Sequence, residues 1–293
     1  MYGASLRNLF LYADRQDTYN EIITSEINQL SPTGLTELLF AGRTTSGSHY
    51  LMTTGPLPND RSRPERKIAS PYVFAEFCRL ILGDRVEMMK GCYDKLHLTP
   101  TTFSATGMVF KYRAHQFLQE GRTLEIFPIL ASSEVQGAKH LKYVYNRYTD
   151  NVRQRQQFIL PRLDLCPVDK DTQRTHELGV YYCSRSPTFP SVDSWVLVQP
   201  NPREPPIVLA FQMTINKKEH DAKPSSLDWL RMLVPLDAKV YHVILTPEAV
   251  EPEINVSADY LTTTFLGGRG VNDAFPVFHC EIGIVELFKP RVT

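Results

Sequence analysis

Three polar side chains flank two apolar runs that could form adjacent strands. Asp193 precedes the run 194–198, and Gln212 and Thr214 come at the end of the run that begins at 207. A Pro-rich segment between the runs predicts a turn, so a hairpin would bring an acid, an amide and a hydroxyl together. Gln212 and Thr214 would share one side of their strand because strand side chains alternate. An acid and a second oxygen ligand placed in this way could hold a divalent cation beside a phosphodiester.

The chemistry that this arrangement predicts is metal-assisted hydrolysis. Asp193 and Gln212 would bind Mg²⁺, which poises a water and relieves charge on the leaving oxygen. Thr214 would lie beside them, and Lys217 or His220 would assist the water or the scissile phosphate from the following segment. An alternative interpretation is that Asp193 caps a turn and that the other two are ordinary polar residues at a strand end.

Two basic groups upstream predict contact with phosphates. Lys111 and His115 are four residues apart in a predicted helix over 106–119, so they share a face. The alternative is a surface lysine beside a partly buried histidine.

A second basic stretch, 139–155, alternates cations with aromatic rings. Lys139, Lys142, Tyr145 and Arg147 are its candidate binding residues. Cations meet phosphates and rings stack on bases, which suits single-stranded nucleic acid. The alternative is an exposed strand whose tyrosines pack inward by alternation.

Composition narrows the class of protein. The 293 residues are 42% hydrophobic and have a formal net charge of zero, so any nucleic-acid contact must come from a local basic patch. The five cysteines have no CxxC spacing and are expected to be buried, reduced thiols. That pattern favours an intracellular location, cytoplasm or nucleus, and no apolar run approaches a membrane span.

The order of predicted elements indicates an α/β or α+β fold in three regions. Residues 1–100 are predicted to be mostly helical with one loop-rich interruption, 101–250 to form a mixed sheet flanked by helices, and 251–293 to be an extension of added strands. The predicted strands over the sheet region are 124–130, 157–160, 178–183, 194–198, 207–211 and 240–245, with a short helix over 227–233.

Several segments together resemble a known family. The runs ATGMVFKYRAHQFLQEG at 105–121, FPSVDSWVLV from Phe189, and LAFQMTINKKEHDAK from Leu209 are similar to Crinkler and retrotransposon-hot-spot-type proteins of fungi and oomycetes. Upstream, 35–61 and 67–77 resemble the segment that follows the ATPase module of these proteins. The resemblance covers roughly 30–250 and implies a restriction-endonuclease-like fold of the PD-(D/E)XK superfamily, acting on DNA with Mg²⁺.

The resemblance assigns Asp193 as metal ligand, with Gln212 and Thr214 at the positions of the usual acid and lysine, and it matches His115 and His220 to histidines of the family. The chain departs from the pattern at Lys111, where the family has a glutamate, and a lysine repels a cation. Three classes therefore stay open: a nuclease with weakened metal binding, a nucleic-acid-binding protein that does not cut, and an effector that acts through a protein partner. The oligomeric state is left open.

Overall fold

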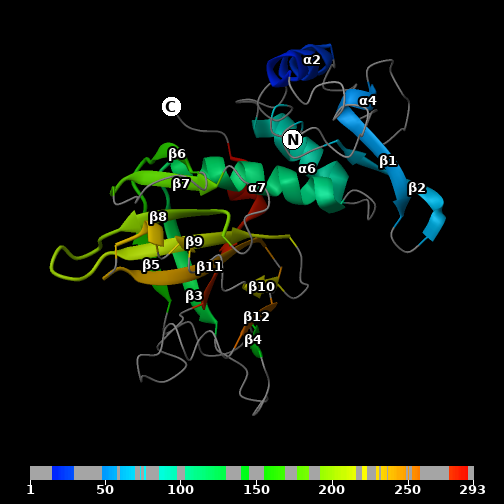
Figure 1. Ribbon diagram of the computed structural model, residues 1–293. Coiled ribbons are helices and arrows are strands. Elements are labelled where there is room, and N and C mark those ends of the chain that lie inside the picture. The colour runs from blue at the N-terminus through cyan, green and yellow to red at the C-terminus, as the bar shows by residue number, and fades with distance from the viewer. Residues whose placement is uncertain are drawn as a thin grey trace. The chain divides into compact units, whose positions relative to one another are not determined.

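The computed structural model describes part of the chain, and its helices and strands are labelled in Figure 1. The described residues are 15–29, 48–57, 60–69, 73, 76, 86–97, 103–129, 140–144, 155–168, 177–184, 192–215, 220–222, 229–230, 232–235, 237–248, 250, 253–257 and 277–289. Two compact units divide the chain: Met1–Arg113 with Phe288–Thr293, and Ala114–Leu287.

The first unit combines helices with a β-hairpin. Its elements are α2 (Gln16–Asn28), α4 (Ser48–Leu51), β1 (Met52–Leu57), β2 (Asp60–Ile68), α6 (Val86–His97) and the first part of α7 (Phe103–Gln119). The prediction of a mostly helical region over 1–100 was wrong at the turn-rich basic stretch, where β1 and β2 pair antiparallel. Glycine, proline and charge in that stretch suggested a loop, but its backbone bonds are satisfied by the hairpin.

The second unit is dominated by a curled, mixed sheet of eight strands, so the protein is of the α+β class. The strand order is β5-β3-β13-β11-β9-β8-β7-β6. The strands are β3 (Thr123–Ile129), β5 (Gln156–Ile159), β6 (Asp164–Val168), β7 (Val180–Ser184), β8 (Ser194–Val198), β9 (Ile207–Met213), β11 (Lys239–Pro247) and β13 (Val277–Ile282), and α11 (Ile284–Leu287) follows β13.

The predicted hairpin at the centre of the sheet is confirmed. β8 and β9 pair antiparallel, with Ser194 opposite Phe211 and Val198 opposite Ile207. β11 then pairs parallel to β9, and the connection between them contains the helical residues 229–230 and 232–233. Apolar side chains fill both faces of β8 and β9, because each face is covered.

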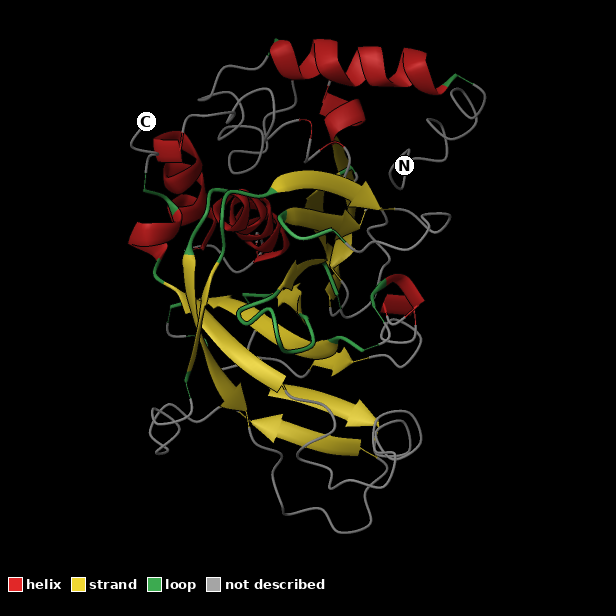
Figure 2. Ribbon diagram, turned by 90° about the vertical axis from the view of Figure 1, so that its left-hand side faces the viewer, coloured by secondary structure: helices red, strands yellow, loops and turns green. Residues whose placement is uncertain are grey.

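The two faces of the sheet bury different sets of side chains. On one face Trp195 stacks on Tyr182 at 5.6 Å between ring centroids and meets Trp229 edge-on at 5.5 Å. Leu230, Leu233 and Val234 belong to the same core cluster. On the other face lies the end of α7, which Figure 2 shows along its axis, with Ala114, Phe117 and Leu118 buried.

The connection between β5 and β6 forces the sheet to curl. These strands follow each other in the chain with only residues 160–163 between them, yet they form opposite edges of the sheet. Such a link spans at most about 17 Å, whereas the edges of a flat eight-stranded sheet lie about 34 Å apart. The link is fastened by Leu160 N donating to Arg122 O at 2.7 Å and Leu163 N donating to Gln119 O at 3.0 Å.

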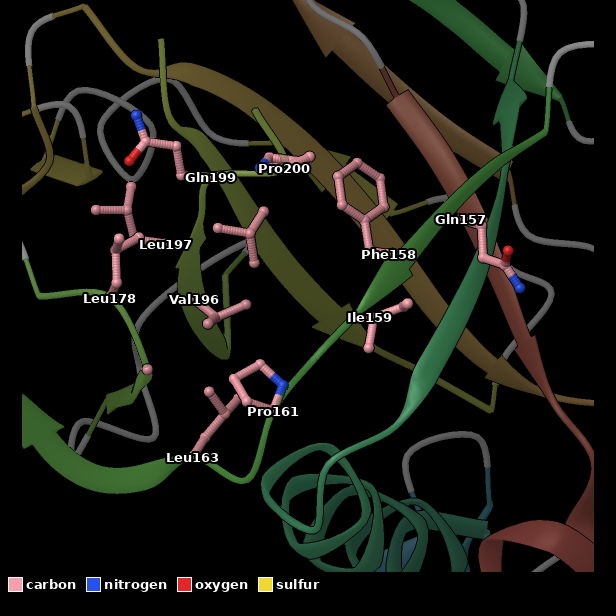
Figure 3. A pocket seen from close by; sticks show the side chains of 12 residues that line it. Gln157, Phe158, Ile159, Pro161, Leu163, Leu178, Val196, Leu197, Gln199 and Pro200 are labelled. Carbon is pink, nitrogen blue, oxygen red and sulfur yellow. The ribbon is translucent and has the colours of Figure 1, made fainter. Parts of the chain in front are cut away.

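A cavity of about 400 Å³ lies where the curled sheet approaches itself. β5 contributes Phe158 and Ile159, the link contributes Pro161 and Leu163, and the far wall comes from 178–179 and 196–200 (Figure 3). Its lining is mainly apolar, with Gln157 and Gln199 as polar members. It lies at the end of β8 away from Asp193, about 17 Å along the strand.

A second, three-stranded sheet belongs to the same unit. Its order is β10-β12-β4, formed by β10 (His220–Ala222), β12 (Glu253–Ser257) and β4 (His140–Val144). β10 and β12 pair parallel, and they follow the carboxyl ends of β9 and β11 within six and five residues. In Figure 1 the β8–β9 turn projects to the left, while β10, β12 and β4 lie below and to the right.

Gly121, between α7 and β3, is required by the closing link. Its φ is +80°, and a Cβ there would come within 3.0 Å of Arg162 N. Gly179 has nearly the same φ, +81°, but a Cβ there would meet open space. We expect Gly121→Ala to lower the free energy of unfolding by about 2 kcal/mol or more, and Gly179→Ala by about 1 kcal/mol.

Urea unfolding followed by circular dichroism measures both glycine variants. Because the backbone angle is matched, the difference between them isolates the contact with the link. Equal losses would contradict a tight approach of Gly121 to residue 162.

Candidate functional site

Asp193 extends the pairing of β8 by one residue and uses its side chain to do so. Its backbone N donates to Phe211 O at 2.8 Å, and Ser184 N donates to its carbonyl oxygen at 3.2 Å. The carboxylate oxygen Oδ2 accepts the backbone N–H of Met213 at 2.7 Å. Asp193 therefore lies directly beside the end of β9, as the sequence predicted, and its carboxylate fastens that end.

Gln212 is held by a histidine from the neighbouring strand. Its Oε1 lies 2.9 Å from Nε2 of His242 on β11. His242 is fully buried, and Gln212 is half-buried. With the amide oxygen facing Nε2, the imidazole is the donor of this hydrogen bond.

Thr214 continues the pairing of β9 with β11. Its N donates to Leu245 O at 3.0 Å, and only 8% of the residue is exposed. Asp193, Gln212 and Thr214 are thus brought together at one end of the β8–β9 hairpin. His220 lies in β10 of the small sheet, where its side chain is not among those described, and Lys217 lies outside the described residues.

The donor set beside β9 fits a divalent cation only in part. Mg²⁺ prefers oxygen ligands, and Asp193 and Gln212 supply carboxylate and amide oxygens. One carboxylate oxygen is already bonded to Met213 N, and the amide oxygen to His242. Over the described residues, no group of three or more His, Cys, Asp or Glu side chains could hold a metal ion. Among the described side chains, a cation here would depend on the Asp193 carboxylate and on oxygens from a substrate.

His115 lies on the other face of the sheet from Asp193. Its Nδ1 is 2.7 Å from the Tyr181 hydroxyl, and Tyr181 donates to Ser194 Oγ at 2.6 Å. Ser194 follows Asp193 in a regularly paired strand, so the two side chains point to opposite faces. His115 and Asp193 therefore lie on opposite faces of the sheet, although the family resemblance matched both to functional residues.

Burial sets the protonation of the tyrosine in this cluster. It raises the pKa of Tyr181 well above the ordinary value, the nearby Cys183 thiol acts in the same direction, and the hydrogen bond to Ser194 lowers the pKa by less. Tyr181 is therefore a neutral hydroxyl over the physiological range.

The basic candidates are only partly placed. Lys111 lies on α7, half-buried, in the first unit. Lys142 lies in β4, in register with Asn255 of β12, and its side chain is not described. Lys139, Tyr145 and Arg147 fall outside the described residues.

Sequence reasoning missed His242, Tyr181, Ser194 and Cys183 as members of polar clusters. Each interrupts or ends a strand that was predicted correctly, so a polar or thiol group within an apolar run was the available signal. Their partners lie on other elements, and no single segment of the sequence determines the pairing register that brings them together.

No family model matches the chain, and neither the curated proteins nor the solved structures contain a match to it. No helix within the described residues is both long and apolar enough to span a bilayer.

Replacing Asp193 is expected to lower the stability of the protein, by an amount that depends on the replacing residue. Asp193→Ala removes the acceptor of Met213 N–H, and we expect the free energy of unfolding to fall by about 2 kcal/mol. Asp193→Asn keeps an oxygen acceptor, so its loss is expected to be about half as large. Urea unfolding measures both, and a smaller loss for alanine than for asparagine would contradict the bond.

We expect the contribution of the buried Tyr181 hydroxyl to the free energy of unfolding to be lost in alkali. Because its pKa is higher folded than unfolded, its contribution is complete below about pH 10 and is lost as pH rises further. Tyr181→Phe removes the hydroxyl and its two contacts, at an expected cost of about 1–2 kcal/mol near pH 8.

The measurement is the difference in unfolding free energy between wild type and Tyr181→Phe, from neutral pH to above pH 10. Other titrating groups are shared and cancel in this difference. It is expected to shrink in alkali, and a constant difference would contradict the burial of the phenol.

Proposed function

We propose that the chain is a restriction-endonuclease-like domain that acts on nucleic acid, with DNA as its substrate. The carrying observation is the meeting of Asp193 with Gln212 at adjoining ends of β8 and β9. The supporting arrangement is α7, the β8–β9 hairpin, helical residues 229–230 and 232–233, and a parallel β11. A Crinkler-type assignment, with nuclear or cytoplasmic location, belongs to this proposal.

The edge that carries Asp193 is a natural place for a phosphodiester. The parallel strands β9 and β11 have their carboxyl ends on the same side of the sheet. Ligands of open α/β sheets bind beside such strand ends. Both strands continue from there into the small sheet, through β10 and β12. The small sheet is thereby tethered to the edge that carries the candidate centre.

The basic and aromatic stretch enters the small sheet through β4. Tyr143 pairs with Ile254, which also pairs with His220, and Lys142 pairs with Asn255. His220 and Lys142, far apart in sequence, therefore belong to one three-stranded sheet. This arrangement supports a binding mode in which β4 contacts the phosphate backbone of the nucleic acid. The end of the large sheet that carries Asp193 would contact the reacting phosphate.

In the catalytic form of the proposal, Asp193 and Gln212 would hold one Mg²⁺ with the substrate. The cation supplies a poised water and charge relief at the leaving oxygen. Thr214 closes the end of β9, and Lys217 and His220 are the candidates to contact the phosphate. With a single carboxylate, metal affinity in the absence of nucleic acid is expected to be weak.

A second candidate is binding without cleavage. It is favoured by the hydrogen bonds that Asp193 Oδ2 and Gln212 Oε1 already make inside the sheet. A site whose oxygens serve the backbone and an imidazole can retain its shape without a metal. The two candidates share the same surface and differ only in whether a cation joins it.

A cleavage assay on the purified chain separates the candidates. Supercoiled plasmid, single-stranded DNA and RNA are incubated with Mg²⁺ or Mn²⁺, and with chelator. We expect metal-dependent nicking of DNA that Asp193→Asn reduces to background, since that variant keeps the acceptor for Met213 N–H but loses the charge. Persistent cutting by Asp193→Asn would overturn the assigned centre.

Gln212→Glu is the matched gain-of-function variant. It adds a second carboxylate beside Asp193 and can still accept a hydrogen bond from His242, so we expect tighter Mg²⁺ binding and faster nicking. Wild type that binds DNA without cutting, with activity appearing only in Gln212→Glu, would select the binding candidate. If neither protein binds or cuts nucleic acid, the proposal is overturned, and a protein partner becomes the function to test.

The binding surface has its own prediction. Lys142→Ala is expected to reduce the slope of log K against log salt by about 1, the release of one counterion. Arg203→Ala, in the exposed turn at the opposite end of the hairpin, removes a cation without changing the slope. Equal slopes for Lys142→Ala and wild type in DNA-binding titrations would exclude β4 from the interface.

A further inference from the structure

A thiol, an imidazole and two hydroxyls meet on the sheet face that carries α7. Cys183 Sγ lies 3.9 Å from Nδ1 of His115, and the same nitrogen lies 2.7 Å from the Tyr181 hydroxyl. Tyr181 donates in turn to Ser194 Oγ at 2.6 Å. Cys183 and Ser194 are directly opposite in the pairing of β7 with β8, so their side chains share this face.

The cluster is buried at one end and accessible at the other. Tyr181 and Ser194 have no exposed surface, whereas Cys183 and His115 are each half-buried. The two hydroxyls therefore lie in the core, whereas the residues that carry the thiol and the imidazole are partly exposed.

The direction of the hydrogen bonds decides where a proton is preferred. Tyr181 has one hydroxyl hydrogen, and it is directed to Ser194. Its oxygen then faces Nδ1 of His115 with lone pairs, which favours a hydrogen on that nitrogen. With Nδ1 holding its hydrogen toward Tyr181, the imidazole takes up a further proton at Nε2, and the imidazolium beside Sγ would stabilise a Cys183 thiolate. Burial raises the pKa of Tyr181, so Tyr181 itself stays protonated.

We propose that Cys183 and His115 form a thiol–imidazole pair that makes Cys183 a nucleophilic modification site for soft electrophiles, with Tyr181 orienting the imidazole. In the reaction, the sulfur forms a bond to the electrophilic carbon and the leaving group departs with its electron pair. The thiol proton is released to solvent, and the imidazolium form of His115 stabilises the thiolate that attacks. This site lies on the opposite face from Asp193 and stands independently of the nuclease proposal.

Two other cysteines supply controls within the same molecule. Cys166 on β6 is also half-buried, and no imidazole lies in contact with it among the described residues. Cys280 on β13 is buried, and burial, reinforced by nearby glutamates, raises its pKa to about 12. The alkylation rate of Cys166 measures the reactivity of a partly exposed thiol. Alkylation of Cys280 would show that the core had opened.

Charged and titratable groups near the pair come from three described elements. Tyr181 lies on β7, Asp193 adjoins Ser194 on β8, and Lys111 lies one turn before His115 on α7. Tyr181 stays neutral near pH 7. The dependence of the thiol's reaction on pH is therefore expected to follow the thiol–imidazole pair.

The test is alkylation of the native full-length chain by iodoacetamide, quantified for each cysteine by peptide mass spectrometry. Near pH 7 we expect Cys183 to react faster than Cys166 and Cys280 to stay unmodified. His115→Gln is expected to slow Cys183 by about threefold or more while leaving Cys166 unchanged; the effect is modest because a more acidic thiol is also a weaker nucleophile.

Tyr181→Phe tests the orienting role separately. It is expected to slow Cys183 by a smaller factor and, like His115→Gln, to move the profile of rate against pH, between about pH 6 and about pH 9, to higher pH. Loss of packing alone would change the rate without moving the profile. A Cys183 rate and profile unaffected by His115→Gln, with circular dichroism unchanged, would overturn the pair.

Discussion

The short link between β5 and β6 is the constraint on which the second unit depends. It joins opposite edges of an eight-stranded sheet through residues 160–163, so the sheet cannot lie flat. The link is bonded to Gln119 and Arg122, which places the end of α7 and the start of β3 at the closing point. The positive φ of Gly121 and the apolar cavity beside Pro161 both follow from this closure.

Strand alternation separates the polar side chains into two faces. Asp193 and Ser194 are adjacent in sequence, but strand alternation sends one side chain toward the Gln212 side and the other toward Tyr181. Two polar clusters therefore lie back to back across a single sheet. A substitution at one can be tested with the other as an internal reference, because they share strands but not partners.

Asp193 illustrates how structural and chemical roles constrain each other. Its carboxylate completes the hydrogen bonding of β9 at Met213, which fixes its position relative to Gln212. A rigid strand end is what a metal centre requires of its ligands. The same bond occupies an oxygen that a cation would use, and His242 does likewise for Gln212. Within the proposed function, the strength of metal binding is therefore the property that would distinguish a nuclease from a binding protein.

Local sequence determined most of the elements in the second unit. Period-two and period-3.6 apolar patterns, a Gly stop at 121 and a Pro-rich turn were sufficient for α7, β3, β5, β7, β8, β9 and β11. The meeting of Asp193 with Gln212 was also predictable, because a hairpin brings together residues that are close in sequence. β1 and β2 were missed because their glycine, prolines and charges imitate a loop, and only pairing makes them strands.

Only the tertiary structure decided the sheet order, the curl and the partners of each polar side chain. The sequence predicted His115 and Asp193 as site residues but could not place them on opposite faces, since that depends on the register of β7 with β8. It likewise could not pair His242 with Gln212 or Cys183 with His115, because each pair joins elements far apart in the chain. The periodicity of apolar residues is a local property of one segment. The pairing register of strands is set only when their buried faces pack together in the folded protein.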